Sequence, residues 1–421
     1  MEPIRHKVSF ERSHKFFMNL KTKILIAIDW YRPAHKAGGP ITSIENMVDL
    51  LGDEPHLEFY VVCGVFDYGE QQPLDVPQET WVTVGKSQVQ YWHPKQLGWK
   101  QWMQIYQTLQ PDIIHMQGLW SPKFSILPLL AAQRYKKAKI VVSPRGMLTP
   151  QALKQKGAMK AGVSFVLKAL SAYKNVVFHS TNDQETEEIR LFLNHQDSIP
   201  KGDIVTVAGN PVASGNAILQ MPNVPRNLGG AMKQTKRQKQ RNKLNWIFVG
   251  RISPEKNPLL LLEALQLLEI PTKGYFIGGC QNETYRQQFE EKIKVLPKQH
   301  DVEYLGEKSL QEITEFLGDA DVSINTSISE NFGHAMAEAL SAGVPIIVGP
   351  NTPWQNLSED KSGLVAQYSA QGFADAMQAM AALDFAEHQA YQEGAKKRFA
   401  IQCELSATKA KYLNLYLLPN P

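Results

Sequence analysis

The segment SENFGHAMAEAL, residues 329–340, indicates the fold of this chain when it is taken with its flanks. An apolar run at residues 320–325 leads into the segment, and a second apolar run, Ile346–Val348, follows it after Gly343-Val344-Pro345. We interpret the whole as strand, tight loop, helix, turn and strand. This pattern is typical of one parallel β-α-β unit.

The helix predicted from Asn331 onward would begin beside two carboxylates. The amides of Asn331, Phe332 and Gly333 would open it and offer hydrogen-bond donors to an oxygen-rich ligand. Glu330 lies in the loop, and Glu338, eight residues later, lies about two turns along the helix on the same side. Carboxylates accept hydrogen bonds from sugar hydroxyls. The alternative is that Glu330 caps the helix and Glu338 is a solvated surface charge.

Length and composition favour a two-domain protein of a reducing compartment. The chain has 421 residues, 43% hydrophobic and 20% charged, which is enough for two cores. Its net charge of +4 does not indicate a nucleic-acid partner. Cys63, Cys280 and Cys403 are odd in number and far apart, which argues against a disulfide framework. No apolar run approaches the roughly 20 residues of a membrane span, and the N-terminus lacks the apolar core of a secretory signal.

Residues 1–22 form an N-terminal extension that mixes basic and aromatic residues. Such a segment can anchor a protein on an anionic membrane surface. The alternatives are a disordered tail, or an upstream start codon with Met18 as the native first residue.

From Lys23 the chain alternates between strand-like and helical patterns, which predicts a doubly wound parallel sheet with ligand loops at the carboxyl ends of its strands. The predicted strands are Ile24–Ile28, Phe59–Cys63, Asp112–His115, Ile140–Ser143, Val176–His179 and Ile204–Val207. The predicted helices include Thr42–Leu51, Trp99–Leu109, Phe124–Tyr135 and Asp183–Asn194.

Polar residues follow three of these strands. Gly38 and Gly39 precede a helix, where glycines let amides approach a phosphate, although an ordinary flexible loop fits as well. His115 ends an apolar strand at the expected ligand edge, as a catalytic or a structural residue. Arg145 follows the next strand and would bind an anion or pair with a surface acid.

The segment 213–243 interrupts the alternation and reads as a basic linker. No Asp or Glu occurs between Asp203 and Glu255, while Arg and Lys recur over residues 226–243. A basic run of this kind is usually a solvated loop. The alternative is contact with lipid headgroups or with an acceptor that carries a diphosphate.

A second alternating half starts with a strand at residues 244–249, which leads into GRISPEKN, residues 250–257. Arg251 and Lys256 flank this loop before a helix. Two cations beside exposed amides suit a pyrophosphate without a metal. The alternative is a pair of surface charges.

Together these segments resemble the signatures of retaining glycosyltransferases of family 4, which have the B-type fold. The resemblance is carried by GRISPEKN, by residues 329–338 and by Thr352-Pro353-Trp354. Gly38-Gly39-Pro40 and SPRGM, residues 143–147, are similar to a bacterial subgroup that builds surface polysaccharides. The resemblance covers residues 23–411 and implies two Rossmann-like doubly wound domains that face each other across a cleft.

The resemblance also implies roles for individual residues. Arg251 and Lys256 would hold the donor diphosphate and neutralise the leaving group. Glu338 would bind the ribose hydroxyls. The transferred sugar would be held by Glu330 with the amides of Asn331, Phe332 and Gly333, and His115 would face it. Gly38 and Gly39 would approach the phosphate, and Arg145 would contact the acceptor or an anion. No metal and no cofactor beyond the nucleotide-sugar substrate is implied.

The domains expected on this basis are an acceptor-side domain over residues 23–212, a nucleotide-sugar domain over residues 244–384, and C-terminal helices over residues 385–421 that cross back to the first domain in the family.

The implied enzyme is a retaining hexosyltransferase of O-antigen, capsule or exopolysaccharide synthesis. Its partners would be a nucleotide-sugar and a saccharide or lipid-linked acceptor. We expect it in the cytoplasm, with peripheral attachment to the inner face of the membrane. The alternatives are a sugar-nucleotide epimerase, another non-transferase on this fold, or a non-catalytic binding protein.

Overall fold

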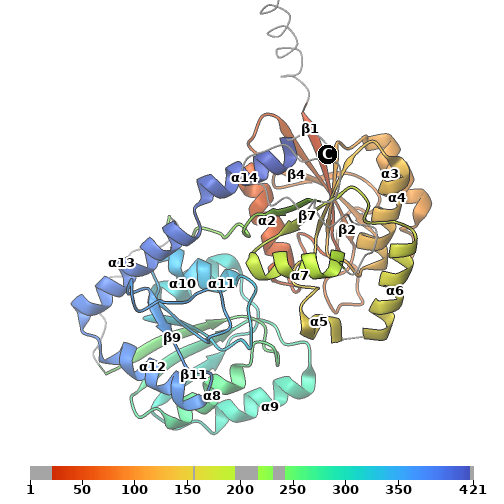
Figure 1. The fold of residues 1–421 in the computed structure, drawn as a ribbon. Coiled ribbons are helices and arrows are strands. Elements are labelled where there is room, and N and C mark those ends of the chain that lie inside the picture. The colour runs from red at the N-terminus through yellow and green to blue at the C-terminus, as the bar shows by residue number, and fades with distance from the viewer. Residues whose placement is uncertain (1–20, 155–156, 195–216, 231–241, 418–421) are drawn as a thin grey trace, which may run out of the picture. The chain divides into compact units, whose positions relative to one another are not determined.

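The computed structural model describes residues 21–154, 157–194, 217–230 and 242–417. These residues form two compact units, Met1–Asn223 with Ser406–Pro421, and Val224–Leu405 (Figure 1). The N-terminal extension up to residue 20, the predicted strand Ile204–Val207 and residues 231–241 of the basic loop lie outside the described residues.

The described part of the first unit is built on an eight-stranded sheet in the order β3-β4-β2-β1-β5-β6-β7-β8. β3 and β4 pair antiparallel, and the other neighbouring strands pair in parallel. The strands are β1 Thr22–Ala27, β2 Leu57–Gly64, β3 Val82–Val84, β4 Ser87–Trp92, β5 Ile113–Gln117, β6 Lys139–Ser143, β7 Val176–Ser180 and β8 Ala217–Gln220. The helices are α2 Gly39–Leu51, α3 Trp99–Leu109, the π-helical turn η1 Pro122–Ile126, α4 Leu127–Tyr135, α5 Pro150–Lys154, α6 Gly157–Ala169, α7 Asp183–Asn194 and α14 Leu405–Leu417.

The second unit contains a sheet of six parallel strands in the order β11-β10-β9-β12-β13-β14 among its described residues. The strands are β9 Leu244–Val249, β10 Thr272–Ile277, β11 His300–Tyr304, β12 Val322–Asn325, β13 Ile346–Val348 and β14 Gly363–Val365. The helices are α8 Pro258–Leu267, α9 Glu283–Lys294, α10 Leu310–Asp319, α11 His334–Ser341, α12 Ala370–Ala382 and α13 Phe385–Gln402.

Both sheets are Rossmann-like. Counted along the chain, the second sheet has the strand order 3-2-1-4-5-6, and the first has the order 3-2-1-4-5-6-7 once β3 is set aside. The order reverses between β1 and β5 in the first unit and between β9 and β12 in the second. Ligands of such sheets bind at the carboxyl ends of the strands beside this reversal. The predicted fold class of two doubly wound α/β domains is therefore confirmed.

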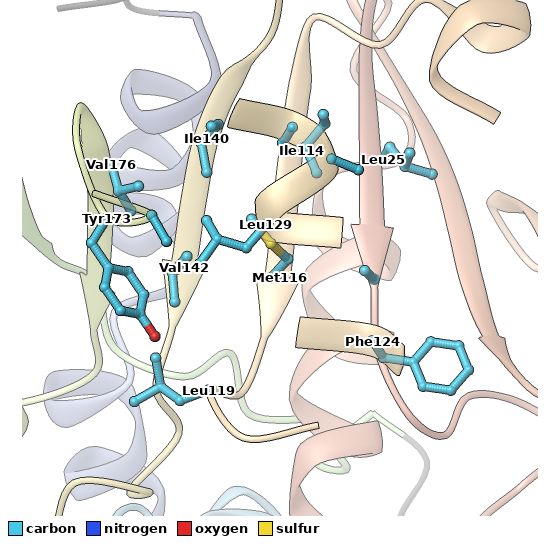
Figure 2. Close-up of a cluster of buried hydrophobic side chains, with 14 of the residues drawn as sticks. Leu25, Ile114, Met116, Leu119, Phe124, Leu129, Ile140, Val142, Tyr173 and Val176 are labelled. Carbon is cyan, nitrogen blue, oxygen red and sulfur yellow. The ribbon is translucent and has the colours of Figure 1, made fainter. Parts of the chain in front are cut away.

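Apolar side chains on both faces hold the strands in place. Every residue of β5, β6 and β7 is buried, as expected for parallel strands covered by helices on both sides. Figure 2 shows part of the first core, where Leu25, Ile114 and Val142 from three neighbouring strands lie near Leu129 of α4. The second unit has separate clusters on its own sheet. Each unit therefore has its own hydrophobic core.

The structure departs from the predicted elements at four places. The sequence analysis missed the hairpin β3–β4, which turns at Gly85 with φ 57°, and the helices α5 and α6. β8 lies within the segment expected to be a linker, because its four residues are too few to show a periodic pattern. The helix predicted from Asn331 starts at His334 instead, since Gly333 has the left-handed φ of 78°.

The C-terminal helices divide between the units. α13 belongs to the second unit, where the His388 ring donates from Nε2 to the Asp321 carbonyl at 2.8 Å. α14 packs in the first unit, and its Tyr412 and Tyr416 side chains are buried there. The expected crossing of the C-terminal helices thus applies to α14 alone. Within the described residues, no helix combines the length and the hydropathy that a membrane span needs.

Candidate functional site

The loops after β9 and β12 meet at the reversal of the second sheet, and an ion pair joins them. Lys256 Nζ contacts Glu330 Oε1, and both side chains are largely shielded from water. The same carboxylate oxygen accepts a 2.7 Å hydrogen bond from Ser327 Oγ and a 3.4 Å contact from Asn325 Nδ2. The structure thus brings together Lys256 and Glu330, two residues predicted from separate motifs.

Backbone and side-chain hydrogen bonds fix the two loops against each other. Thr326 Oγ1 donates to the carbonyls of Lys256 and Asn257 at 3.1 and 2.9 Å. The Ile328 amide donates to the Glu255 carbonyl at 3.0 Å. Tyr368 lies behind them, accepting from Asn257 Nδ2 and donating to the Thr326 carbonyl, both at 3.1 Å. Lys256 and Glu330 are therefore carried by loops that are cross-linked at several points.

The helices that follow these loops start without a side-chain cap. α8 begins after Asn257 (φ 45°) and α11 after Gly333 (φ 78°), and neither residue caps its helix through a side chain. By contrast, α9, α10, α12 and α13 are each capped by the side chain of Asn282, Ser309, Ser369 or Asp384. Uncapped first turns beside Lys256 favour an anionic ligand, because the helix dipole and its amides point there.

Arg251 lies in the same loop as Lys256, directly after β9. Partial burial acts to raise the pKa of the neighbouring Glu255 carboxyl. The pKa of Glu255 is nevertheless lowered. The effect of burial is outweighed by hydrogen bonds from the Glu255 backbone amide and the Ser253 hydroxyl and by the positive charges of Arg251 and Lys256. The loop also passes close to Gly278, where a Cβ would lie 2.1 Å from the Gly250 carbonyl oxygen. Only glycine fits at position 278, which keeps the start of the Arg251 loop against β10.

Glu338 is buried in the second turn of α11 and faces a residue that the sequence analysis placed in the basic loop. Its Oε1 lies 3.6 Å from Arg226 Nη1. Ser341 of the same helix accepts from the Leu228 amide at 2.9 Å. Residues 224–230 therefore pack on α11, so this part of the predicted linker belongs to the second unit.

Phe332 lies beside the predicted Thr352-Pro353-Trp354 motif. Trp354 Nε1 donates to the Phe332 carbonyl at 2.7 Å, and the two rings are 6.0 Å apart. The Glu330 amide donates to the Asn351 carbonyl at 2.9 Å. The loop before α11 is thus held from the side of β13, while Asn331 at its tip is exposed.

In the first unit, Gly38 and Gly39 lie at the exposed start of α2, after β1. Gly38 has φ 67° and provides no side-chain cap, and a Cβ there would meet no atom within 4 Å. Buried Asp67 holds the preceding turn by accepting from the amides of His35 and Lys36 at 3.0 and 3.1 Å. The two glycines predicted to face a phosphate therefore stand at the start of α2, and Asp67 holds the turn that precedes them.

His115 does not occupy the predicted position. β5 continues to Gln117, so His115 lies inside the strand, and its side chain is fully buried. The prediction that His115 faces a sugar is therefore wrong for this structure. The strand was expected to end at His115, after an apolar run, but it continues for two residues beyond it. The histidine is structural here.

A buried hydrogen-bond chain explains the His115 side chain. His179 Nε2 must donate to the Met221 carbonyl, at 3.0 Å, so its Nδ1 accepts from Ser143 Oγ at 2.8 Å. Ser143 Oγ then accepts from His115 Nε2 at 2.7 Å, and Tyr416 donates to His115 Nδ1 at 2.9 Å. Burial lowers the pKa of both histidines, that of His179 to about 3, and Arg145 adds to the effect. Both rings are therefore neutral.

Arg145 lies beside this chain, after β6, with φ 55°. Its Nε donates to Gln117 Oε1 at 2.8 Å and its Nη1 to Asn223 Oδ1. The amide of Gly146 donates to Glu185 Oε1 at 2.7 Å. Arg145 is thus held by neutral amide oxygens, which leaves its positive charge available to an anion.

The sequence analysis missed several residues that shape the second-unit site, namely Asn325, Ser327, Tyr368 and Arg226. Asn325 is the last residue of β12 and Ser327 follows the strand, so their position at the strand's carboxyl end was the available signal. Tyr368 and Arg226 reach the site from distant segments, and no local pattern marks them. Within the described ranges, no three His, Cys, Asp or Glu side chains gather as a metal site would need.

Residues 232–398 match the model of the family described as Glycosyl transferases group 1. The mouse protein "GDP-Man:Man(3)GlcNAc(2)-PP-Dol alpha-1,2-mannosyltransferase" is 29% identical over 147 residues, which are 31% of this chain and 30% of that protein. A Caenorhabditis elegans protein of the same name is 28% identical over 137 residues, 29% of this chain and 28% of that protein. The chain thus spans about three tenths of the length of these curated relatives.

Solved structures match over nearly the whole chain. Anabaena HepE, solved in complex with UDP and glucose, has a TM-score of 0.63 at 15% identity and covers 94% of this chain and 99% of its own. Sucrose-phosphate synthase from Thermosynechococcus elongatus has a TM-score of 0.65 at 15% identity, covering 94% and 98%. The chain therefore has the B-type glycosyltransferase fold and carries, over residues 232–398, a domain of the glycosyl transferases group 1 family.

Proposed function

We propose that this protein is a retaining glycosyltransferase of the hexosyltransferase type, which moves a sugar from a nucleotide-sugar to a saccharide or lipid-linked saccharide. The observation that carries the proposal is the pairing of Lys256 with Glu330 where the second sheet reverses, beside the uncapped starts of α8 and α11. A cation, a carboxylate and two helix N-termini at one place match a diphosphate joined to a polyhydroxylated sugar.

Each charged group has a role in this proposal. Arg251 and Lys256 bind the donor diphosphate, and their fixed charge stabilises the leaving phosphate as the bond to the sugar breaks. Glu330 and the amides of Asn331, Phe332 and Gly333 hold the sugar hydroxyls. Lys256 contacts Glu330 in this structure. A bound donor would therefore insert between them or share Lys256 with Glu330.

Glu338 binds the ribose hydroxyls in this proposal. Its carboxylate faces Arg226, whose guanidinium lies 3.6 Å from Glu338 Oε1 and orients the side chain. Gly38 and Gly39 contribute amides to the phosphate from the first unit, and Arg145 binds an anionic part of the acceptor. No metal takes part. The reaction occurs on one face of the sugar, with the leaving phosphate helping to deprotonate the acceptor, and Glu330 is not assigned as a covalent nucleophile.

The names of the similar proteins support a choice of donor and setting. The mannosyltransferases are named for GDP-mannose and a dolichol-linked acceptor, and HepE was solved with UDP and glucose. We therefore take a UDP- or GDP-hexose as donor and a lipid-linked saccharide as acceptor. The setting of O-antigen, capsule or exopolysaccharide synthesis rests only on the resemblance of Gly38-Gly39-Pro40 and residues 143–147 to the bacterial subgroup. The enzyme acts in the cytoplasm, peripherally on the inner face of the membrane.

A thermal-shift screen of the purified chain against UDP-, GDP-, ADP- and dTDP-sugars tests the proposal. A ligand at 100 times its dissociation constant stabilises the native state by about 2.7 kcal/mol. We expect stabilisation by one nucleotide class and its loss in Lys256→Ala. The matched control is Lys292→Ala, which removes a surface lysine of α9 that pairs with Glu263 of α8 at 2.9 Å.

The next measurement identifies the reaction. Incubation of the stabilising nucleotide-sugar with lipid-linked saccharide acceptors should release the nucleoside diphosphate and extend the acceptor with retained anomeric configuration. Inverted product would overturn the retaining mechanism. Conversion of the donor to a different nucleotide-sugar without an acceptor would show an epimerase. Absence of stabilisation by every nucleotide-sugar tested would contradict the donor site itself.

A further inference from the structure

One helix of the first unit has an outer face that is apolar and exposed. On α6, the exposed fractions are 73% for Phe165, 56% for Met159 and 54% for Val166, and Leu170 just after the helix is 59% exposed. Met159, Gly162 and Val166 recur at helical spacing, with Phe165 beside them. Leu153 on the preceding helix α5 is exposed as well. Exposed large apolar side chains thus occur on two consecutive helices, α5 and α6. Figure 1 shows where these two helices lie in the fold.

The inward face of the same helix is already satisfied. Leu167 is buried in the core of the first unit, and Val163 packs against that core. α6 is therefore apolar on both its inner and its outer side. A helix at the surface of a globular protein normally carries polar residues on its outer side. Contiguous exposed apolar side chains mark an interaction site rather than ordinary surface.

The sequence that forms α5, α6 and their flanks carries charge of one sign. No Asp or Glu occurs between Asp112 and Asp183. Among the described lysines, Lys154 lies on α5, Lys160 on α6 and Lys174 shortly after α6. Lys154 is exposed beside Leu153. Lys160 lies with its ammonium 6.0 Å from the Trp120 ring centroid and donates to the Ala152 carbonyl, so it ties α6 back to α5.

We propose that the α5–α6 surface, formed by Leu153, Met159, Phe165, Val166 and Leu170 with the lysines around them, docks on a lipid bilayer with anionic headgroups. Short helices with apolar residues on the membrane side and lysines at the edge lie in the plane of the membrane interface. Anionic headgroups attract the lysines, and the apolar side chains enter the acyl boundary. The inference deepens the proposed function, since a lipid-linked acceptor is presented at such a surface.

A second copy of the chain is a weaker occupant of this face. Two copies meeting through it would bring two sets of lysines together with no acidic residue of residues 113–182 to compensate. An anionic bilayer supplies the missing negative charge and the apolar environment together. The charge pattern therefore selects the bilayer.

Vesicle flotation with the full-length chain tests the proposal. The vesicles contain phosphatidylglycerol and phosphatidylcholine, or phosphatidylcholine alone. We expect the wild type to float with the anionic vesicles and Phe165→Glu to partition at least about tenfold more weakly. The substitution removes an aromatic side chain that would enter the bilayer, and it adds a negative charge that the anionic headgroups repel. Ile401→Glu on α13 is the matched control, since Ile401 is 76% exposed but lies in the second unit; it should float like the wild type.

Equal flotation of Phe165→Glu and the wild type would overturn the proposal, as would an absence of wild-type binding to anionic vesicles. A wild-type dimer in light scattering that Phe165→Glu makes monomeric, without vesicle binding, would assign the surface to self-association instead. Thermal stabilisation by a nucleotide-sugar is measured on the same variants. Because it reports the second unit, stabilisation without flotation refutes only the docking surface, and flotation without stabilisation refutes only the transferase.

Discussion

Lys256 and Glu330 show how single residues set up the proposed chemistry. Each is largely shielded from water, and Glu330 is also held by Ser327 and Asn325. Without Lys256, Glu330 would keep the hydrogen bonds from Ser327 and Asn325, so its carboxylate would not be left wholly unpaired. Removal of Lys256 should therefore destabilise the fold less than the loss of a deeply buried partner would. A loss of activity in Lys256→Ala can then be attributed to the site rather than to unfolding.

We expect Lys256→Ala and Glu338→Ala each to lower turnover by at least about 100-fold, because each removes a charged contact to the donor that the transition state needs. Far-ultraviolet circular dichroism and the unfolding midpoint should show that both variants fold. Glu393→Gln is the control, since it alters an exposed pair with Lys396 on α13. Near-normal turnover in both site variants would refute the site assignment.

The buried histidines predict a pH dependence of stability rather than of catalysis. His115 and His179 stay neutral in the folded state, because burial lowers the pKa of both below the ordinary value of 6.5. Below pH 6.5 the unfolded chain binds protons that the folded chain does not. The free energy of unfolding should therefore fall with decreasing pH, by up to about 1.4 kcal/mol per pH unit for each histidine. Urea titrations between pH 7.5 and 5 measure this, and His179→Gln should flatten the slope. A slope unchanged by that substitution would contradict the assignment.

At the scale of elements, α14 is attached to the first sheet through polar groups as well as apolar ones. Tyr416 donates to His115 on β5, and Lys139 at the start of β6 donates to the Leu415 carbonyl in the last turn of α14 at 2.7 Å. Burial lowers the pKa of Lys139 to about 8. A cation at the C-terminal turn also complements the helix dipole. The last helix is thus a fixed part of the first unit.

Tyr416→Phe should lower the free energy of unfolding by about 1–2 kcal/mol, because His115 Nδ1 is left buried without its donor. Stabilisation by the nucleotide-sugar should be unchanged, since Tyr416 is buried in the first unit and is not one of the proposed donor contacts. Urea unfolding with and without the ligand measures both quantities. An unchanged unfolding free energy would show that the chain of hydrogen bonds contributes nothing, and a lost ligand response would show that α14 acts on the donor site.

For the whole molecule, the charged residues of the proposed donor site lie in the second unit and the proposed docking surface lies in the first. Each unit repeats the same strand order, so each has a reversal point where loops gather. In the second unit these loops hold Arg251, Lys256 and Glu330. In the first unit, Asp29 follows β1 and accepts from Ser121 Oγ at 2.7 Å, and burial raises its pKa. Asp29 is thus a partly buried carboxyl after β1, the strand beside which the order of the first sheet reverses.

Hydrogen exchange with and without the nucleotide-sugar should show this division. We expect the largest protection in residues 250–258 and 326–336, because their amides either bind the donor or are fixed by those that do. β5, β6 and β7 should change little, since they are already buried. Protection that was largest in the first unit would place the donor elsewhere. Phe165→Glu provides the control, as it leaves the donor loops untouched.

Much of the fold could be predicted because a strongly periodic hydrophobic pattern identifies a strand or helix from its own short segment of sequence. β5, β6 and β7 were found within two residues, and so was α3. The hairpin β3–β4 was missed although its strands alternate and its turn contains Gly85. β8 was missed because four residues carry too little pattern. The position of His115 was misjudged because strand ends are the least certain part of such predictions.

The sequence by itself determined the chemistry available at the candidate site, since Arg251, Lys256, Glu330 and Glu338 stand in short motifs directly after strands. Only the tertiary structure decided which of them meet. The Lys256–Glu330 pair, the Arg226–Glu338 pair and the support from Tyr368 join segments 74, 112 and 42 or more residues apart. The tertiary structure also showed that α6 has an unpartnered apolar face. The reason is physical: periodicity and turn chemistry act between near neighbours, whereas burial and pairing depend on where the folded chain returns.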